Sequence, residues 1–149
     1  MICPCLCYRD AKAALEWLEK AAGFTTLCMK PGEGEAVAHA ELKLGTSVIM
    51  VATAKPELGR CSPADQAFAG AKTPSATHSI YIVASDFDAA YKRAKNAGAN
   101  ITKEPYITAY GSRDFELTDP EGGKWYFGTY APDLEKSATA SQVAELVLG

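Results

Sequence analysis

The pattern of apolar and polar residues along the chain occurs twice. An apolar run ends at Asp10, and apolar residues at helical spacing follow it as far as Gly23. The same order returns with Asp86 and Gly98, and the two aspartates lie 76 positions apart. An aspartate accepts hydrogen bonds from the first amides of a helix, and a glycine tolerates the left-handed turn that ends one. Each copy therefore predicts a strand followed by a capped helix.

Three further strand-like runs follow each predicted helix, and turn-forming glycine, proline and aspartate residues separate them. The predicted strands span residues 24–29, 37–44 and 47–52 in the first copy and 101–108, 113–118 and 124–130 in the second. The order is βαβββ, twice. One helix covers only one face of a four-stranded sheet, so two such sheets can curl around a shared cavity. We predict an α+β fold with two βαβββ modules in tandem, forming an open cup-shaped mixed sheet with the helices on the outside.

The repeat also predicts the domain organisation. We expect a single domain over residues 1–131, with module one at 1–52, a connecting arm at 53–76 and module two at 77–131, followed by a tail with a short helix at 132–149. The arm is longer than most connections and rich in alanine, proline, glycine and serine. It is interpreted as a lid, a contact arm between subunits or a plain linker.

Composition narrows the classes of partner. With 48% hydrophobic and 22% charged residues, the 149-residue chain has the composition of one soluble domain with a real core. The net charge of −3 offers no basic excess for nucleic acid, and no apolar stretch is long enough to span a membrane. No basic segment precedes an apolar one near the N-terminus, so we expect a cytoplasmic protein. The odd number of cysteines, five, argues against a disulfide framework.

Several short segments together resemble a known superfamily. They are residues 39–45, 47–50, 78–81, 111–115, 119–125 and 127–130. In this combination the chain resembles the vicinal oxygen chelate superfamily of glyoxalases, bleomycin resistance proteins and extradiol dioxygenases, and most of all its small glyoxalase-like, bleomycin-resistance-like branch. The resemblance implies paired modules forming a cup, usually in a homodimer. It also implies one divalent metal, held by four His or Glu side chains near the starts of the first strands and on the last strands of the modules.

The four positions at which the resemblance implies metal ligands carry other residues here. They are Cys3, Ile49 or Met50, Ser79 and Tyr126. Magnesium, manganese, iron and zinc centres need imidazoles, carboxylates or several thiolates. We therefore expect no cofactor at these positions, with a divalent metal left as the alternative.

Two histidines keep that alternative open. His78 lies one residue from Ser79, so strand alternation points it away from the cup unless the register slips. His39 and Glu41 share one face of a predicted strand, as a metal site or an acid–base pair would require. The same alternation is also the ordinary pattern of a half-solvated strand.

Aromatic and small polar side chains are predicted to line the cup instead. Alternation puts Tyr81 on the face of Ser79, while Tyr110, Ser112 and Arg113 lie at a hairpin that opens towards the ligand in the resembling proteins. Aromatic planes with a few hydroxyl groups suit a flat organic ligand. The alternative is that Tyr81 and Tyr126 only fill the core.

Three cysteines are the unusual feature of the first strand. Cys3, Cys5 and Cys7 are spaced by two, so they share one strand face and are expected to point into the cup. They either bind a soft metal ion or a thiophilic electrophile, or they only pack as small apolar groups. Cys28 and Cys61 lie on separate predicted elements and carry no predicted role.

These observations predict a protein that binds a small aromatic organic molecule in its cup without the usual metal. The alternative is a metal-dependent lyase, isomerase or dioxygenase of the same superfamily. No catalytic residue is assigned. The predicted ligand-binding residues are Cys3, Cys5, Cys7, Met50, Ser79, Tyr81, Tyr110, Arg113 and Tyr126. Whether the cup closes within one chain or across a homodimer is left open.

Overall fold

The computed structural model describes residues 1–55 and 79–135. Its elements are β1 (Cys5–Tyr8), α1 (Ala11–Trp17), a π-helical turn η1 (Leu18–Ala22), β2 (Thr25–Pro31), β3 (Val37–Leu44) and β4 (Ser47–Thr53), then β5 (Ile80–Val83), α3 (Phe87–Asn96), β6 (Asn100–Ile107), β7 (Arg113–Thr118) and β8 (Lys124–Gly128). No helix within these two ranges is long and apolar enough to cross a bilayer. His78, Cys61, most of the predicted arm and the predicted tail helix lie outside the described residues.

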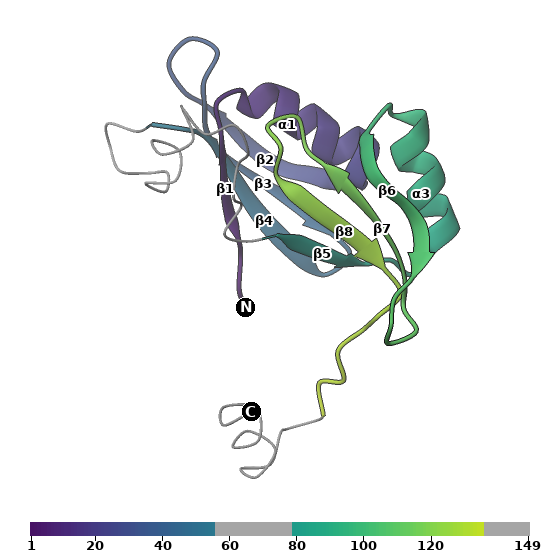
Figure 1. Ribbon diagram of the computed structural model, residues 1–149. Coiled ribbons are helices and arrows are strands. Elements are labelled where there is room, and N and C mark those ends of the chain that lie inside the picture. Colours follow the sequence, from purple (N-terminus) through teal and green to yellow (C-terminus); the bar gives the residue numbers. More distant parts are fainter. Residues whose placement is uncertain (56–78, 136–149) are drawn as a thin grey trace, which may run out of the picture.

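The predicted α+β fold with two βαβββ modules is confirmed (Figure 1). Sheet A has the strand order β1-β4-β3-β2, and sheet B has the equivalent order β5-β8-β7-β6. Both sheets are mixed, because β1 runs parallel to β4 and β5 runs parallel to β8, whereas the other neighbours are antiparallel. The sheets stay open and do not close into a barrel.

The helix ends follow the predicted capping chemistry. The carboxylates of Asp10 and Asp86 each accept a hydrogen bond from the amide three residues further on, at 3.0 and 2.9 Å. Gly23 and Gly98 have φ angles of 85° and 69°, the left-handed conformation that ends a helix at low cost only for glycine. The π-helical turn before Gly23 was not predicted.

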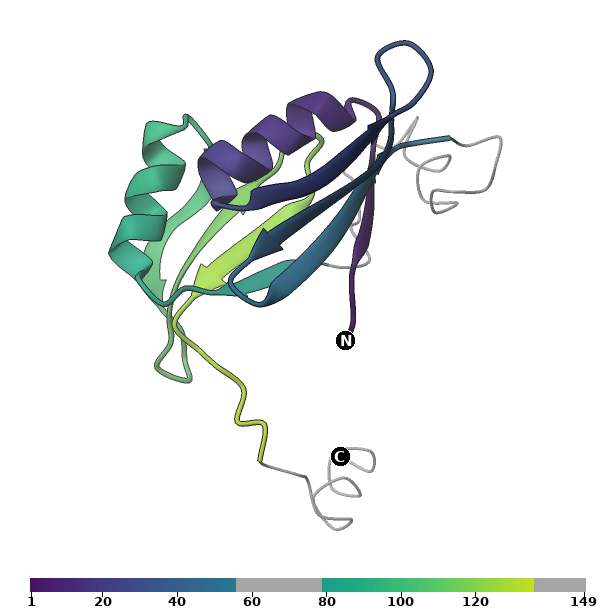
Figure 2. The same cartoon turned by 180° about the vertical axis from the view of Figure 1, so that it is seen from behind.

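Each helix covers one face of its sheet (Figure 2), and the buried side chains of the two covered faces form a single core. The ring of Trp125 in β8 lies 5.5 Å from the ring of Trp17 in α1 and 6.1 Å from that of Phe24. On the other side of the core, Phe87 of α3 meets Phe115 of β7 edge to face at 5.4 Å. Side chains of both modules therefore complete one hydrophobic core, and the opposite faces of both sheets turn away from it.

A buried carboxylate joins the modules at the β7–β8 turn. Oδ2 of Asp119 accepts hydrogen bonds from the Tyr8 hydroxyl of β1 at 2.9 Å and from the Trp125 indole at 3.1 Å. Oδ1 accepts the backbone amides of Glu121 and Gly123. Burial, followed by the charge of Asp119 and the hydrogen bond to it, raises the pKa of Tyr8, so its hydroxyl stays protonated and donates. The sequence predicted only a turn here.

Candidate functional site

The uncovered faces of the two sheets, here called the open faces, carry the positions at which the resemblance implies metal ligands. Ile49 is buried, whereas Met50 is half-buried on the open face, so the structure selects Met50 from the two predicted alternatives. Tyr126 holds the equivalent place on sheet B. Cys3 and Ser79 lie just before β1 and β5. None of the selected four residues supplies an imidazole or a carboxylate.

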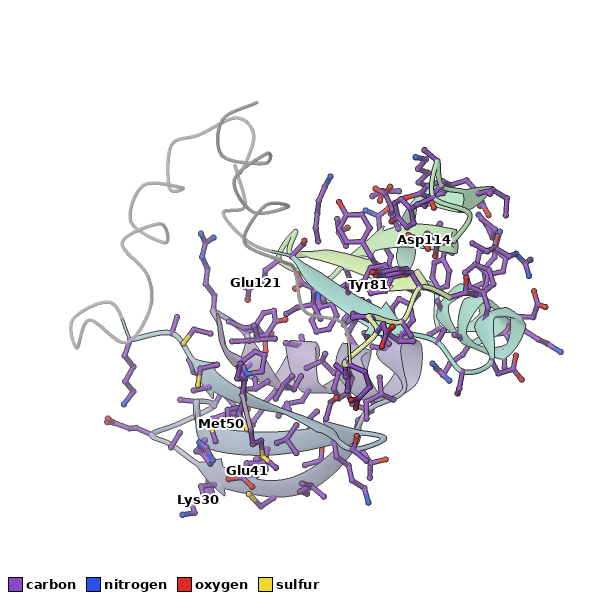
Figure 3. All side chains as sticks on the ribbon, turned by 90° about the horizontal axis from the view of Figure 1, so that it is seen from below. Lys30, Glu41, Met50, Tyr81, Asp114 and Glu121 are labelled. Atoms are coloured by element: carbon purple, nitrogen blue, oxygen red, sulfur yellow. The ribbon has the colours of Figure 1, made fainter. Side chains whose placement is uncertain are left out.

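On sheet A, one residue from each strand forms a row across the open face. Cys28 pairs with Glu41, Glu41 with Met50, and Met50 with Cys5. We call these four residues the sulfur row, because three of them carry sulfur. Figure 3 labels Glu41 and Met50 on this sheet, together with Lys30. Residues far apart in the sequence thus form one surface.

On sheet B, the equivalent row has different chemistry. Lys103 pairs with Glu116, Glu116 with Tyr126, and Tyr126 with Tyr81. We call these four residues the tyrosine row. The two rows match position by position through the internal repeat, with a glutamate on the third strand of each module. The first module therefore presents Cys5 and Met50 where the second presents Tyr81 and Tyr126, and Cys28 where the second presents Lys103.

The cysteines of β1 lie beside Met50. The Cys5 thiol lies 3.8 Å from the Met50 sulfur and also 3.8 Å from the carbonyl oxygen of Cys3. Tyr8 is buried on the covered face, and alternation puts Cys5 and Cys7 on the open face. Cys3 precedes the strand and is half-buried. The structure thus gathers Cys5, Cys7 and Met50 at one edge of sheet A.

A second group of polar side chains lies at the other end of the sulfur row. Nε2 of His39 donates to Oε1 of Glu41 at 3.1 Å, and one ligand atom each from Cys28, His39 and Glu41 lie within 4.8 Å of one another. The His39 hydrogen bond is the main cause that lowers the pKa of Glu41, and the Cys28 hydrogen bond and the charge of Lys30 lower it further against partial desolvation. The carboxylate is therefore held ionised beside a thiol and an imidazole.

Sheet B holds a buried acid, Asp114, next to Tyr81, and Figure 3 labels both residues. The Tyr81 hydroxyl donates to Oδ1 of Asp114 at 3.2 Å and lies 3.3 Å from Oγ of Ser112, which also donates to Asp114. The amide of Tyr130 donates to both hydroxyl oxygens. A Cβ atom at Gly128 would lie only 2.1 Å from Asp114 and from Tyr81, so this cluster requires glycine there. The sequence placed Ser112 at the hairpin near the ligand, but it did not assign Asp114 to the site.

A third phenol lies beside the tyrosine row. The Tyr106 hydroxyl donates to Glu116 at 2.8 Å, and the Lys103 ammonium lies 3.5 Å from the centre of the Tyr106 ring. Desolvation, then the hydrogen bond and the charge of Glu116, raise the pKa of Tyr106. Tyr106 and Glu116 were also not assigned from sequence. A strand in which acidic residues alternate with buried apolar ones is the signal that points to Asp114 and Glu116.

Two of the predicted hairpin residues, Arg113 and Tyr110, lie apart from these rows, whereas Ser112 contacts Tyr81. The Arg113 guanidinium pairs with Asp88 at 2.9 Å and covers the Phe87 ring at 4.4 Å, so α3 holds it on the covered side of sheet B. Tyr110 is 66% exposed and meets Tyr130 edge to face at 5.7 Å. The structure therefore brings together Cys5, Cys7 and Met50 on one sheet and Tyr81 and Tyr126 on the other, and it brings Arg113 to neither group.

Comparisons with known proteins agree with this architecture. The family model described as Glyoxalase/Bleomycin resistance protein/Dioxygenase superfamily matches residues 3–127. Uncharacterized protein Rv0887c of Mycobacterium tuberculosis (strain H37Rv) is 29% identical over 126 residues, covering 84% of this chain and 71% of that protein. Uncharacterized protein Mb0911c of Mycobacterium bovis is also 29% identical over 126 residues, covering 84% of this chain and 80% of that protein.

Solved structures share the fold. TioX from Micromonospora sp. ML1 superimposes with a TM-score of 0.64 at 26% identity, covering 90% of this chain and 98% of that one. The fosfomycin resistance protein FosX from Mesorhizobium loti gives 0.59 at 13% identity, covering 88% and 91%. A glyoxalase I mutant from Zea mays gives 0.65 at 15% identity, covering 89% of this chain but only 46% of that one. The last two similarities concern the fold alone.

Proposed function

The chain belongs to the glyoxalase/bleomycin resistance protein/dioxygenase superfamily, and we propose that it binds a small aromatic organic molecule over its open faces without the metal of the family's metal-dependent members. One observation carries the proposal. Cys3, Met50, Ser79 and Tyr126 occupy the implied metal positions and offer two sulfur atoms and two hydroxyl groups. A hard divalent ion has no carboxylate or imidazole there to replace its water shell.

The tyrosine row supports an aromatic ligand. Tyr81 and Tyr126 pair on neighbouring strands, and Tyr81 is 37% exposed, so part of its ring is open to a ligand. Rings of this kind stack on flat molecules, while phenol hydroxyls donate selective hydrogen bonds. Desolvation raises the pKa of Tyr81, so its hydroxyl keeps the proton that it donates to Asp114, and this hydrogen bond holds the ring in place for stacking.

We further propose that a homodimer completes the cup. Both open faces turn away from the core of their own chain, so a single copy leaves each of them uncovered by the described residues. In a twofold dimer, sheet A of one copy can face sheet B of its partner. The twofold axis then also places sheet B of the first copy against sheet A of the partner, so that all four open faces are covered. Pairing sheet A with its own copy would leave sheet B open. A half-exposed apolar side chain on the open face of sheet B, Val83 at 48%, supports such a contact.

Ligand binding after removal of metal tests the main proposal. We expect planar aromatic antibiotics, screened by thermal shift, to include a compound whose affinity is the same before and after treatment with a chelator. Tyr126→Ala should weaken that affinity about threefold to tenfold, the value of one aromatic contact. Lys92→Ala, at an exposed position on α3, is the control and should bind normally.

A metal requirement would favour the alternative function. If chelation abolishes ligand binding and one metal ion per chain restores it, the metal-dependent lyase, isomerase or dioxygenase becomes the better assignment, provided that substitution of Met50 and Tyr126 removes the ion. For the dimer, light scattering after gel filtration should give twice the chain mass. A monomer at the concentration used for binding contradicts the shared cup.

A further inference from the structure

We propose that Cys28, His39 and Glu41 form a Zn²⁺ site on the open face of sheet A. The site lies on β2 and β3, whereas the resemblance implies metal ligands near the first and on the last strands of the modules. It shares no residue with Cys3, Met50, Ser79 and Tyr126, although Glu41 pairs with Met50 on the same face, so the two sites can be tested by separate substitutions.

The distances fit one small ion. Zinc binds nitrogen and oxygen at about 2.0–2.2 Å and sulfur at about 2.3 Å, so a tetrahedral ion keeps its ligand atoms about 3.3–3.8 Å apart. Here Nε2 of His39 and Oε1 of Glu41 are 3.1 Å apart, and one ring nitrogen of His39, one carboxylate oxygen of Glu41 and the Cys28 sulfur all lie within 4.8 Å of one another. Side-chain rotation of a few tenths of an ångström to about 1 Å would bring all three atoms onto one ion.

The backbone holds these groups on one face. His39 and Glu41 are two residues apart in β3, so both point to the open side, and antiparallel pairing sets Cys28 directly opposite Glu41. The pairing shifts register between Thr26 and Cys28, and the irregularity brings the thiol to the open face rather than the covered one. Strands position a ligand set more firmly than loops do.

The donor set selects the metal. A thiolate, an imidazole and a carboxylate together are typical of zinc, whereas Mg²⁺ and Ca²⁺ prefer oxygen atoms alone. Three protein ligands leave a fourth position for water, which is the arrangement of an open zinc site. The equivalent residues of sheet B, Lys103, Asp114 and Glu116, include a cation and cannot form such a site.

Zinc binding changes the protonation of His39 and Cys28. Without metal, the ring nitrogen Nε2 of His39 carries the hydrogen that it donates to Glu41. Zinc takes the place of that hydrogen, so the imidazole carries its proton on Nδ1 instead. The Cys28 thiol loses its proton to solvent and binds as thiolate. Titrations in buffers with different ionisation heats should therefore reveal proton release on binding.

The experiment titrates the full-length protein, treated with chelator and kept reduced, with Zn²⁺ by calorimetry and with Co²⁺ by absorption spectroscopy. We expect one ion per chain and an intense thiolate-to-cobalt charge-transfer band. Cys28→Ser should remove that band, and Cys28→Ser, His39→Ala and Glu41→Gln should each weaken Zn²⁺ binding at least about tenfold. Circular dichroism of each variant verifies the fold.

Matched controls separate this site from the other thiols. Cys5→Ser changes the second exposed cysteine of the sulfur row, and Glu116→Gln changes the glutamate equivalent to Glu41 on sheet B. Both should bind zinc like the unchanged protein. The proposal is wrong if the unchanged protein takes up no zinc, or if Cys5→Ser abolishes binding while Cys28→Ser preserves it. If Cys28→Ser still binds the aromatic ligand, the proposed function does not depend on the zinc site.

Discussion

At the scale of single residues, a buried polar group can lose its hydrogen-bond partner through one conservative substitution. Tyr8 is the clearest example, because its hydroxyl in module one donates to the buried carboxylate of Asp119 in module two. We predict that Tyr8→Phe lowers the free energy of unfolding by about 2 kcal/mol, the value of a hydrogen bond to a charged group. Urea denaturation followed by tryptophan fluorescence measures this loss.

The same substitution at an exposed tyrosine is the control. Tyr110→Phe removes a hydroxyl from a side chain that is 66% exposed and should change stability by less than about 0.5 kcal/mol. Equal losses in the two variants would contradict the role assigned to Asp119.

The cluster around Tyr81 depends on the lack of a side chain at Gly128. We predict that Gly128→Ala costs about 1–3 kcal/mol, because its Cβ would overlap Asp114 and Tyr81, and Asp114 is buried. Gly32→Ala is the matched control, since neither glycine has a positive φ and the nearest atom to its Cβ would be 3.1 Å away. Thermal unfolding should rank the Gly128 variant clearly below the Gly32 variant.

The hydrogen bond between His39 and Glu41 gives a prediction about pH. It lowers the pKa of Glu41 in the folded chain, so it stabilises the fold above the ordinary glutamate pKa, and this stabilisation is lost as the pH falls through the lowered value. In metal-free protein, carbon-detected NMR should show the Glu41 midpoint below the ordinary value and higher in His39→Ala. Glu104, whose pKa Tyr91 and Lys95 lower, is the internal reference. An unchanged Glu41 midpoint in the variant would exclude His39 as the cause.

At the scale of elements, the two helix ends provide a matched comparison within one chain. Gly23 and Gly98 both adopt the left-handed conformation, but a Cβ at Gly23 would lie 2.5 Å from the Arg93 guanidinium, and one at Gly98 would meet nothing within 4 Å. Arg93 donates to the carbonyls of Ala21 and Ala22, so it cannot move without losing those bonds.

We therefore predict that Gly98→Ala costs about 1 kcal/mol and that Gly23→Ala costs about 1–2 kcal/mol more. In an Arg93→Ala background the two alanine variants should become equal, because the obstructing side chain is gone. Urea denaturation of the set measures the difference. If it persists without Arg93, the guanidinium is not its cause.

The elements also show how far sequence reasoning extends. Asp10, Asp86 and the alternating strands predicted the helix starts and the βαβββ order, because capping and burial are local effects. Cys28 received no predicted role, since its pairing with Glu41 depends on a register shift that the local pattern does not reveal. The sequence predicted that Arg113 points towards the ligand, because it lies at the hairpin. Its actual contacts, Asp88 and Phe87 of α3, are distant in sequence, so the local pattern does not reveal them.

At the scale of the whole molecule, the shared core predicts cooperative unfolding. Trp125 of module two packs against Trp17 and Phe24 of module one, so neither module completes its core alone. We predict one transition, with coincident midpoints by far-ultraviolet circular dichroism and by fluorescence. Residues 1–55 expressed alone should lack a cooperative transition. Two separated transitions in the intact chain would contradict the shared core.

The position of the sulfur row and the tyrosine row in different modules has a genetic consequence under the proposed dimer. Each cup then takes one row from each copy. If one chain carries a substitution at Met50 that abolishes binding and another carries one at Tyr126, each of them fails as a homodimer. Their mixed dimer contains one cup with both defects and one cup with none. Co-expression of two inactive alleles should then restore binding, with one intact site of two in each mixed dimer, which is intragenic complementation.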